Sequence, residues 1–128
     1  MPIVLLTNDL MVASRIEGAA ARAGVPFQSA ANADDALSRG AANGATLFLV
    51  DLSTAPMDIT SIVGRAHSMT VPPPTIIGFG PHVHKERLAA ARAAGCDEVL
   101  SRGQFFADLE AIVSRDSSGA GQGTAGGG

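Results

Sequence analysis

The stretch LFLVDLS, residues 47–53, decides the fold, because an unbroken apolar run ends in it at a carboxylate, Asp51. No glycine or proline accounts for the end of the run. A short, continuously apolar segment is typical of a strand buried on both faces of a parallel sheet. Open parallel sheets form their sites outside the carboxyl ends of the strands. Asp51 is therefore either a turn residue or part of a site, and the residues that follow the other strands decide between these two interpretations.

Similar apolar segments recur along the chain and alternate with Ala-rich, charge-bearing segments. The predicted strands cover residues 3–7, 25–30, 46–50, 75–79 and 97–101. The predicted helices cover residues 10–23, 33–42, 59–67, 84–94 and 103–115, with Asn32 and Asp58 as N-caps of the second and third. This alternation predicts an α/β domain of five βα units with a parallel sheet. Pro26 and Gln28 place the second strand at an edge, whereas the first and fourth strands have the apolar character of central ones.

Length and composition restrict the class of protein. A chain of 128 residues is the size of one domain. We expect residues 1–115 to fold and the Gly- and Ser-rich residues 116–128 to form a disordered tail. A net charge of −3 with nine Lys and Arg disfavours nucleic acid and anionic membranes as partners. The short apolar start and the lone Cys96 predict a cytoplasmic protein with no membrane span.

The residues that follow the predicted central strands are the candidates for a site. Asn8 and Asp9 follow the first strand, Asp51 the third, Gly80 the fourth and Arg102 the fifth. Because the carboxyl ends of parallel strands meet at one edge of the sheet, we expect two carboxylates and an amide to converge there. His82 and His84 have no third ligand nearby in the sequence, so we interpret both as surface residues.

Three motifs resemble the receiver domain of bacterial two-component response regulators: VLLTNDLMVASRI at residues 4–16, LFLVDLS, and AAGCDEVLSRGQF at residues 93–105. The resemblance covers about residues 2 to 114. It implies a doubly wound, flavodoxin-like (CheY-like) (βα)5 three-layer sandwich, with a five-stranded parallel sheet of order 2-1-3-4-5. It also implies that Asp51 accepts a phosphoryl group, and that Asn8, Asp9, Asp51 and the carbonyl of Ser53 form a weak Mg²⁺ site.

The chain departs from the pattern of that family at several positions. Gly80 takes the place of a hydroxyl residue and Arg102 that of a lysine, so both are only candidates for contact with the phosphoryl group. Asn8 removes one charge from the metal site, and Val99 stands where the family has an aromatic ring. We expect the longer, planar guanidinium of Arg102 to pair statically with Asp51 instead of tracking a phosphate. The resemblance is therefore to a degenerate, or pseudo-receiver, form.

The first hypothesis for the function is an atypical receiver-like domain that is no enzyme and transduces signals by docking to a protein partner, a kinase or an output protein. The resemblance places the docking face on the fourth helix, fifth strand and fifth helix, where Lys85, Arg87 and Arg92 add polar specificity. An alternative is a Mg²⁺-dependent phosphoacceptor that a histidine kinase phosphorylates at Asp51. A further alternative is a flavodoxin-like module that binds a small ligand in the same crevice.

Overall fold

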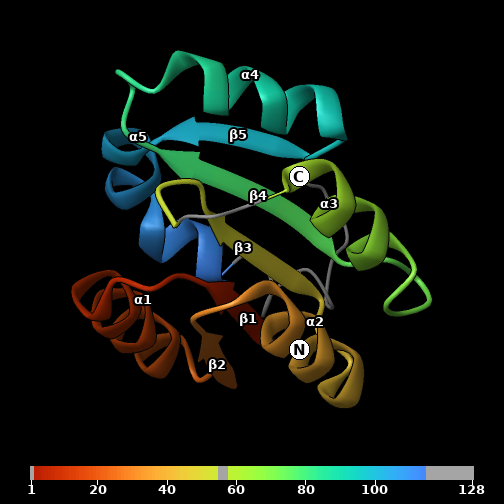
Figure 1. The fold of residues 1–128 in the computed structure, drawn as a ribbon. Coiled ribbons are helices and arrows are strands. Elements are labelled where there is room, and N and C mark those ends of the chain that lie inside the picture. The colour runs from red at the N-terminus through yellow and green to blue at the C-terminus, as the bar shows by residue number, and fades with distance from the viewer. Residues whose placement is uncertain (1, 55–57, 115–128) are drawn as a thin grey trace, which may run out of the picture.

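The computed structural model describes residues 2–54 and 58–114, so the expected tail at 116–128 and the domain end at residue 115 lie outside the described residues. The described chain forms one parallel five-stranded sheet in the order β2-β1-β3-β4-β5, which confirms the predicted CheY-like strand order (Figure 1). The strands are β1 (Ile3–Leu6), β2 (Phe27–Ala30), β3 (Leu47–Asp51), β4 (Thr75–Gly80) and β5 (Glu98–Ser101).

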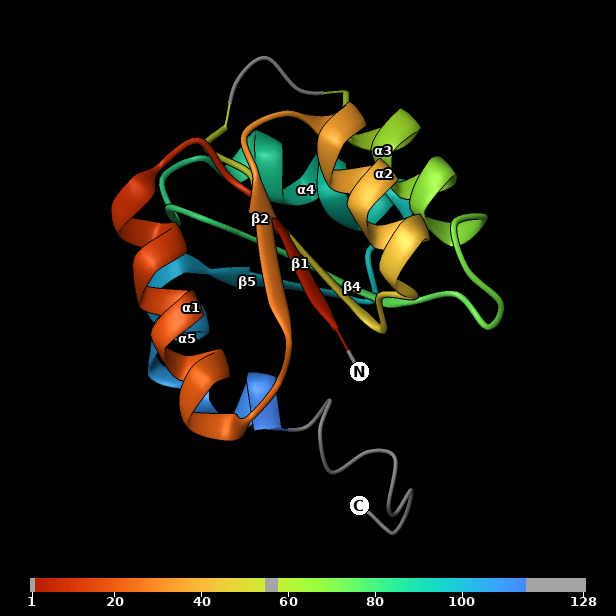
Figure 2. The same ribbon diagram turned by 90° about the horizontal axis from the view of Figure 1, so that it is seen from below.

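Helices cover both faces of the sheet, α1 and α5 on one side and α2, α3 and α4 on the other (Figures 1 and 2). Their bounds are α1 (Leu10–Ala23), α2 (Ala33–Asn43), α3 (Ile59–His67), α4 (Lys85–Ala94) and α5 (Arg102–Ala107); residues 109–114 are also helical, after a turn at residue 108. Asp9, Asn32 and Asp58 cap the first three helices through their side chains. No helix in the described ranges is long and apolar enough to cross a membrane.

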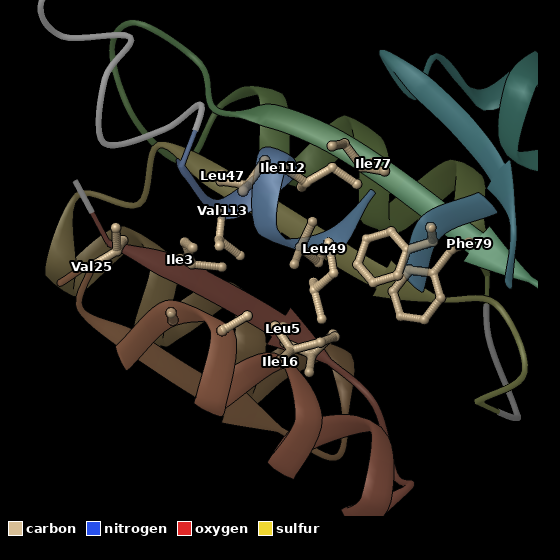
Figure 3. Close-up of a cluster of buried hydrophobic side chains, with 14 of the residues drawn as sticks. Ile3, Leu5, Ile16, Val25, Leu47, Leu49, Ile77, Phe79, Ile112 and Val113 are labelled. Atoms are coloured by element: carbon tan, nitrogen blue, oxygen red, sulfur yellow. The ribbon is translucent and has the colours of Figure 1, made fainter. Parts of the chain in front are cut away.

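The strands divide their side chains between two cores. Ile3 and Leu5 of β1 point toward α1 and α5, whereas Val4 and Leu6 point toward α2, α3 and α4. Figure 3 shows the first core, in which Leu5, Leu49 and Ile16 pack together. Full burial of an aliphatic side chain of this size contributes about 1.5–3 kcal/mol. Both faces of the central strands are therefore apolar, as their unbroken runs predict.

Two boundaries differ from the sequence prediction and affect the site. Strand β3 includes Asp51, which lies opposite Phe79 of β4, so the carboxylate belongs to the sheet itself. Helix α5 begins at Arg102, one residue earlier than predicted, because Ser101 and Gln104 form a capping box. Arg102 thus projects from the first turn of a helix instead of from a strand end.

Candidate functional site

The carboxylate of Asp51 is closed off from solvent. Its side chain is 1% exposed, and each of its oxygens has a donor within the protein. The hydroxyl of Thr7 donates to Oδ2 at 2.7 Å, and the backbone N–H of Ser53 donates to Oδ1 at 2.9 Å. Thr7 reaches Asp51 because Leu6 lies opposite Val50 in the parallel register of β1 and β3. These two hydrogen bonds offset part of the cost of burying the carboxylate.

Asp9 lies at the same edge of the sheet as Asp51, as predicted, and the hydroxyl of Thr7 connects the two residues. The backbone N–H of Asp9 donates to Thr7 Oγ1 at 3.1 Å. The Asp9 side chain caps α1, since its Oδ1 accepts from the N–H groups of Met11 and Val12 at 2.9 and 3.2 Å. One oxygen of Asp9 is therefore committed to the helix end.

Arg102 pairs with Asp9, so the expected static pair between Arg102 and Asp51 was wrong. Its Nη2 lies 3.8 Å from Asp9 Oδ2, with both side chains about 40% exposed. A pair of this length and exposure contributes little stability. The reason for the difference is geometric, because Arg102 starts on a helix at the surface whereas Asp51 lies inside the sheet.

Two threonines that the sequence reasoning missed organise this edge. Besides Thr7, Thr54 is 4% exposed, and its Oγ1 accepts the backbone N–H of Asn8 at 3.2 Å. The side chain of Asn8 is exposed. Ser53 Oγ is buried and has no hydrogen-bond partner among the described residues. A sequence signal did exist, since one hydroxyl residue ends the first predicted strand and another lies three positions after Asp51.

The space beside Gly80 is occupied. A Cβ at residue 80 would lie 3.2 Å from the Cβ of Leu52, a residue that is only 3% exposed. The backbone of Leu52 is fixed on both sides: its N–H donates to the carbonyl of Phe79 at 2.8 Å, and its carbonyl accepts from Arg87 Nη1 at 2.9 Å. The missing hydroxyl at residue 80 thus coincides with a tightly packed loop, and that loop is anchored to α4.

The three basic residues predicted for the docking face differ in their contacts. Lys85, Arg87 and Arg92 all lie on α4 and are exposed as residues. The guanidinium of Arg87 is tied to the loop after β3, as described above. Of the two histidines interpreted as surface residues, His82 is exposed, whereas Nδ1 of His84 is buried without a hydrogen-bond partner in the described part of the chain.

The residues at this edge do not form a ready Mg²⁺ site. No group of three His, Cys, Asp or Glu side chains that could hold a metal occurs within residues 2–54 and 58–114. Both oxygens of Asp51 accept internal hydrogen bonds, and Asp9 caps a helix and faces Arg102. Mg²⁺ requires oxygen ligands in near-octahedral geometry. Each Asp51 oxygen keeps a further lone pair, so the obstacle to metal binding is the burial of the residue, which is only 1% exposed.

No family model matches the sequence, and no curated protein is significantly similar to it. Solved structures do match. A response-regulator signal receiver domain from Bermanella marisrubri is 21% identical, with a TM-score of 0.74 over 91% of this chain and 95% of that one. A response regulator from Burkholderia pseudomallei with a phosphorylated aspartic acid and a calcium ion is 16% identical, with a TM-score of 0.70 over 97% and 75%.

A third match is an atypical orphan response regulator described as having a phosphorylation-independent regulatory mechanism. It is 16% identical, with a TM-score of 0.69 over 90% of this chain and 91% of that one. The phosphorylated and the phosphorylation-independent protein are equally similar to this chain, so the likeness does not extend to the chemistry. The chain has the CheY-like fold of response-regulator receiver domains.

Proposed function

We propose that this chain is a receiver-fold signalling module that acts by docking to a protein, and that its output does not depend on phosphorylation of Asp51. The observation that carries the proposal is the closure of Asp51, which is 1% exposed and has an internal donor on each oxygen. In a phosphoryl transfer, one of these oxygens has to attack the donor phosphorus in line. The carboxylate would therefore have to become accessible to the phosphoryl donor before it could react.

The surroundings of Asp51 support the same proposal. At Gly80 no side-chain hydroxyl is present to follow a phosphoryl oxygen, and Leu52 fills the space where one would enter. Arg102 faces Asp9. The resemblance to receivers assigns the response to phosphorylation to residues 80 and 102. This chain therefore lacks the side chains of the usual switch at both positions. The atypical orphan regulator among the similar structures is a precedent for this fold working without phosphorylation.

Beryllofluoride, which mimics an acyl phosphate, tests the proposal. We expect that beryllofluoride with Mg²⁺ leaves the amide resonances of Asp9, Asp51 and Gly80 unchanged in an NMR titration. The control is Asp51→Asn, because a change that persists in this variant does not come from the carboxylate. Saturable changes around Asp51 that vanish in Asp51→Asn would overturn the proposal and favour the phosphoacceptor.

For docking, we propose the exposed surface of α4 with Lys85 and Arg92, and we assign Arg87 to anchoring the loop after β3. Small alanines surround these cations on α4, so an acidic surface of a kinase or output protein could approach closely. Charge reversal at Arg92 should weaken binding to a partner recovered by cross-linking, without lowering the melting temperature. Arg39→Glu on α2 is the control on another face, and equal affinities for both variants would contradict the assignment of the face.

The phosphoacceptor alternative keeps one observation in its favour, which is that Asp9 and Asp51 lie at the same sheet edge on either side of Thr7. In this alternative, Mg²⁺ would draw Asp51 away from Thr7 and bind Asp9 in competition with Arg102. Incubation with acetyl phosphate and Mg²⁺, followed by intact mass measurement, tests it directly. A gain of one phosphoryl group in the wild type but not in Asp51→Asn would establish this alternative.

A further inference from the structure

A cavity of about 590 Å³ opens between α1, α5 and the loop after β4, beside the candidate site. Its lining residues come from three separated parts of the chain: Arg15, Pro81, His82, Arg102, Gly103, Phe106 and Ala107. Asp51 is not among them. The cavity shares Arg102 with the candidate site and is otherwise built from residues to which the receiver resemblance gave no role.

The lining of the cavity is cationic. Among the described residues, it contains two guanidinium groups and one imidazole, and no carboxylate. Arg15 makes no ion pair with any described residue, and the ion pair of Arg102 with Asp9 is long, at 3.8 Å. The charge on Arg15 is therefore not neutralised within the described part of the protein. An anion entering the cavity would meet two guanidinium groups with little competition from acids.

Aromatic packing places both guanidinium groups against the same ring, that of Phe106. The guanidinium carbon of Arg15 lies 4.2 Å from the centroid of the Phe106 ring, and that of Arg102 lies 5.7 Å from it. Phe106 contacts Phe79 and Phe105 edge-on, with centroid distances of 6.1 and 5.2 Å. Phe79 and Phe105 stack at 4.0 Å in the core, where Figure 3 shows Phe79. The ring of Phe106 thus packs against buried aromatic side chains, which lowers the entropic cost of positioning both cations.

We propose that this cavity binds a small phosphate-bearing ligand, an organic phosphate monoester or diphosphate, through Arg15 and Arg102. The planar fork of arginine matches phosphate oxygens, and two guanidinium groups that line one cavity provide the charge for a dianion. The cavity is wide open to solvent, and its volume of about 590 Å³ leaves room for more than a lone phosphate. The proposal is independent of whether Asp51 can be phosphorylated, because the lining does not include Asp51.

Calorimetric titrations of the full chain with ADP, AMP, adenosine and pyrophosphate, without Mg²⁺, test the proposal. We expect ADP to bind with a Kd on the order of 0.1–1 mM, which corresponds to only about 4–5.5 kcal/mol. Adenosine should bind at least tenfold more weakly. Pyrophosphate binding as tightly as ADP would support the anion site and identify the phosphate groups alone as the ligand. The proposal would be overturned if none of the four probes bound, or if adenosine bound as tightly as ADP.

Three variants locate the binding. Arg15→Gln should weaken ADP at least tenfold, and Gly103→Leu should abolish binding by filling the cavity. A Cβ at Gly103 meets nothing within 4 Å, so this variant should fold, and its melting temperature verifies that it does. Arg22→Gln is the matched control, because Arg22 lies on the same helix but pairs with Glu110 outside the cavity. Wild-type affinity for ADP in Arg15→Gln would overturn the assignment.

Discussion

The surroundings of Asp51 and the cavity at Arg15 lie at the same edge of one sheet, but the first is closed and the second is open. The carboxylate of Asp51 accepts hydrogen bonds from a short side chain, the threonine hydroxyl, and from a backbone N–H. Leu52 packs against Gly80 beside it. Around Arg15 the side chains are long, and they lean over the ring of Phe106 beside Gly103. Figure 2 shows α1 and α5 side by side on the face of the sheet that they share. The acid at the predicted place is thus buried, whereas the guanidinium groups of Arg15 and Arg102 line an open cavity on the α1–α5 side.

The largest effect is expected from a substitution in the aromatic residues that pack beneath the open cavity. Phe105 is fully buried and stacks on Phe79. Phe105→Ala should lower the free energy of unfolding by about 3–5 kcal/mol, because it leaves a cavity in the core. Urea denaturation measures the change. Met11→Ala, at a side chain that is 80% exposed, should change stability by less than about 0.5 kcal/mol, and similar losses in the two variants would contradict the packing described here.

The closed surroundings of Asp51 depend on the hydroxyl of Thr7. Thr7→Val keeps the shape of the side chain but leaves Asp51 Oδ2 without its donor, so it should cost about 1–3 kcal/mol. Thr70→Val is the control, because the hydroxyl of Thr70 donates to a carbonyl at the exposed surface. Thermal unfolding of both variants checks the difference. An equal, small effect would show that the bond between Thr7 and Asp51 does not stabilise the fold.

Gly80→Ser tests whether the missing hydroxyl could be restored. Its Cβ would lie 3.2 Å from that of Leu52, so we expect a loss of about 1–2 kcal/mol and no gain in the response to beryllofluoride. Gly64→Ala in α3 is the matched control, since a Cβ there meets nothing and should stabilise the helix by about 0.5–1 kcal/mol. A Gly80→Ser variant as stable as wild type and responsive to beryllofluoride would show that the loop adapts.

Cys96 provides the smallest expected effect, at a position away from both regions. Burial and, secondarily, the nearby charge of Asp97 raise the pKa of the Cys96 thiol to about 11. The folded state then keeps the proton at a pH where the unfolded state loses it. The contribution to stability is complete below pH 9 and is lost as the pH rises toward 11. Alkylation at pH 8 should be slower in the folded than in the unfolded chain, and equal rates would contradict this burial.

The sequence alone determined the elements, the strand order and the meeting of Asp9 with Asp51. Apolar runs, cap residues and glycines are local signals, and the rules for parallel sheets place the strand ends at a common edge, whereas the strand order was implied by the resemblance to receiver domains. For the same reason Asn32 and Asp58 were identified as caps, and the structure confirms both.

Only the tertiary structure decided what each of these residues contacts. The bond between Thr7 and Asp51, the packing of Leu52 over Gly80 and the pairing of Arg102 with Asp9 depend on side-chain directions and on a helix that begins one residue early. The cavity at Arg15 joins α1 to α5, which lie far apart along the chain. Periodicity specifies which face a residue occupies, whereas its partner there depends on the packing of several elements at once.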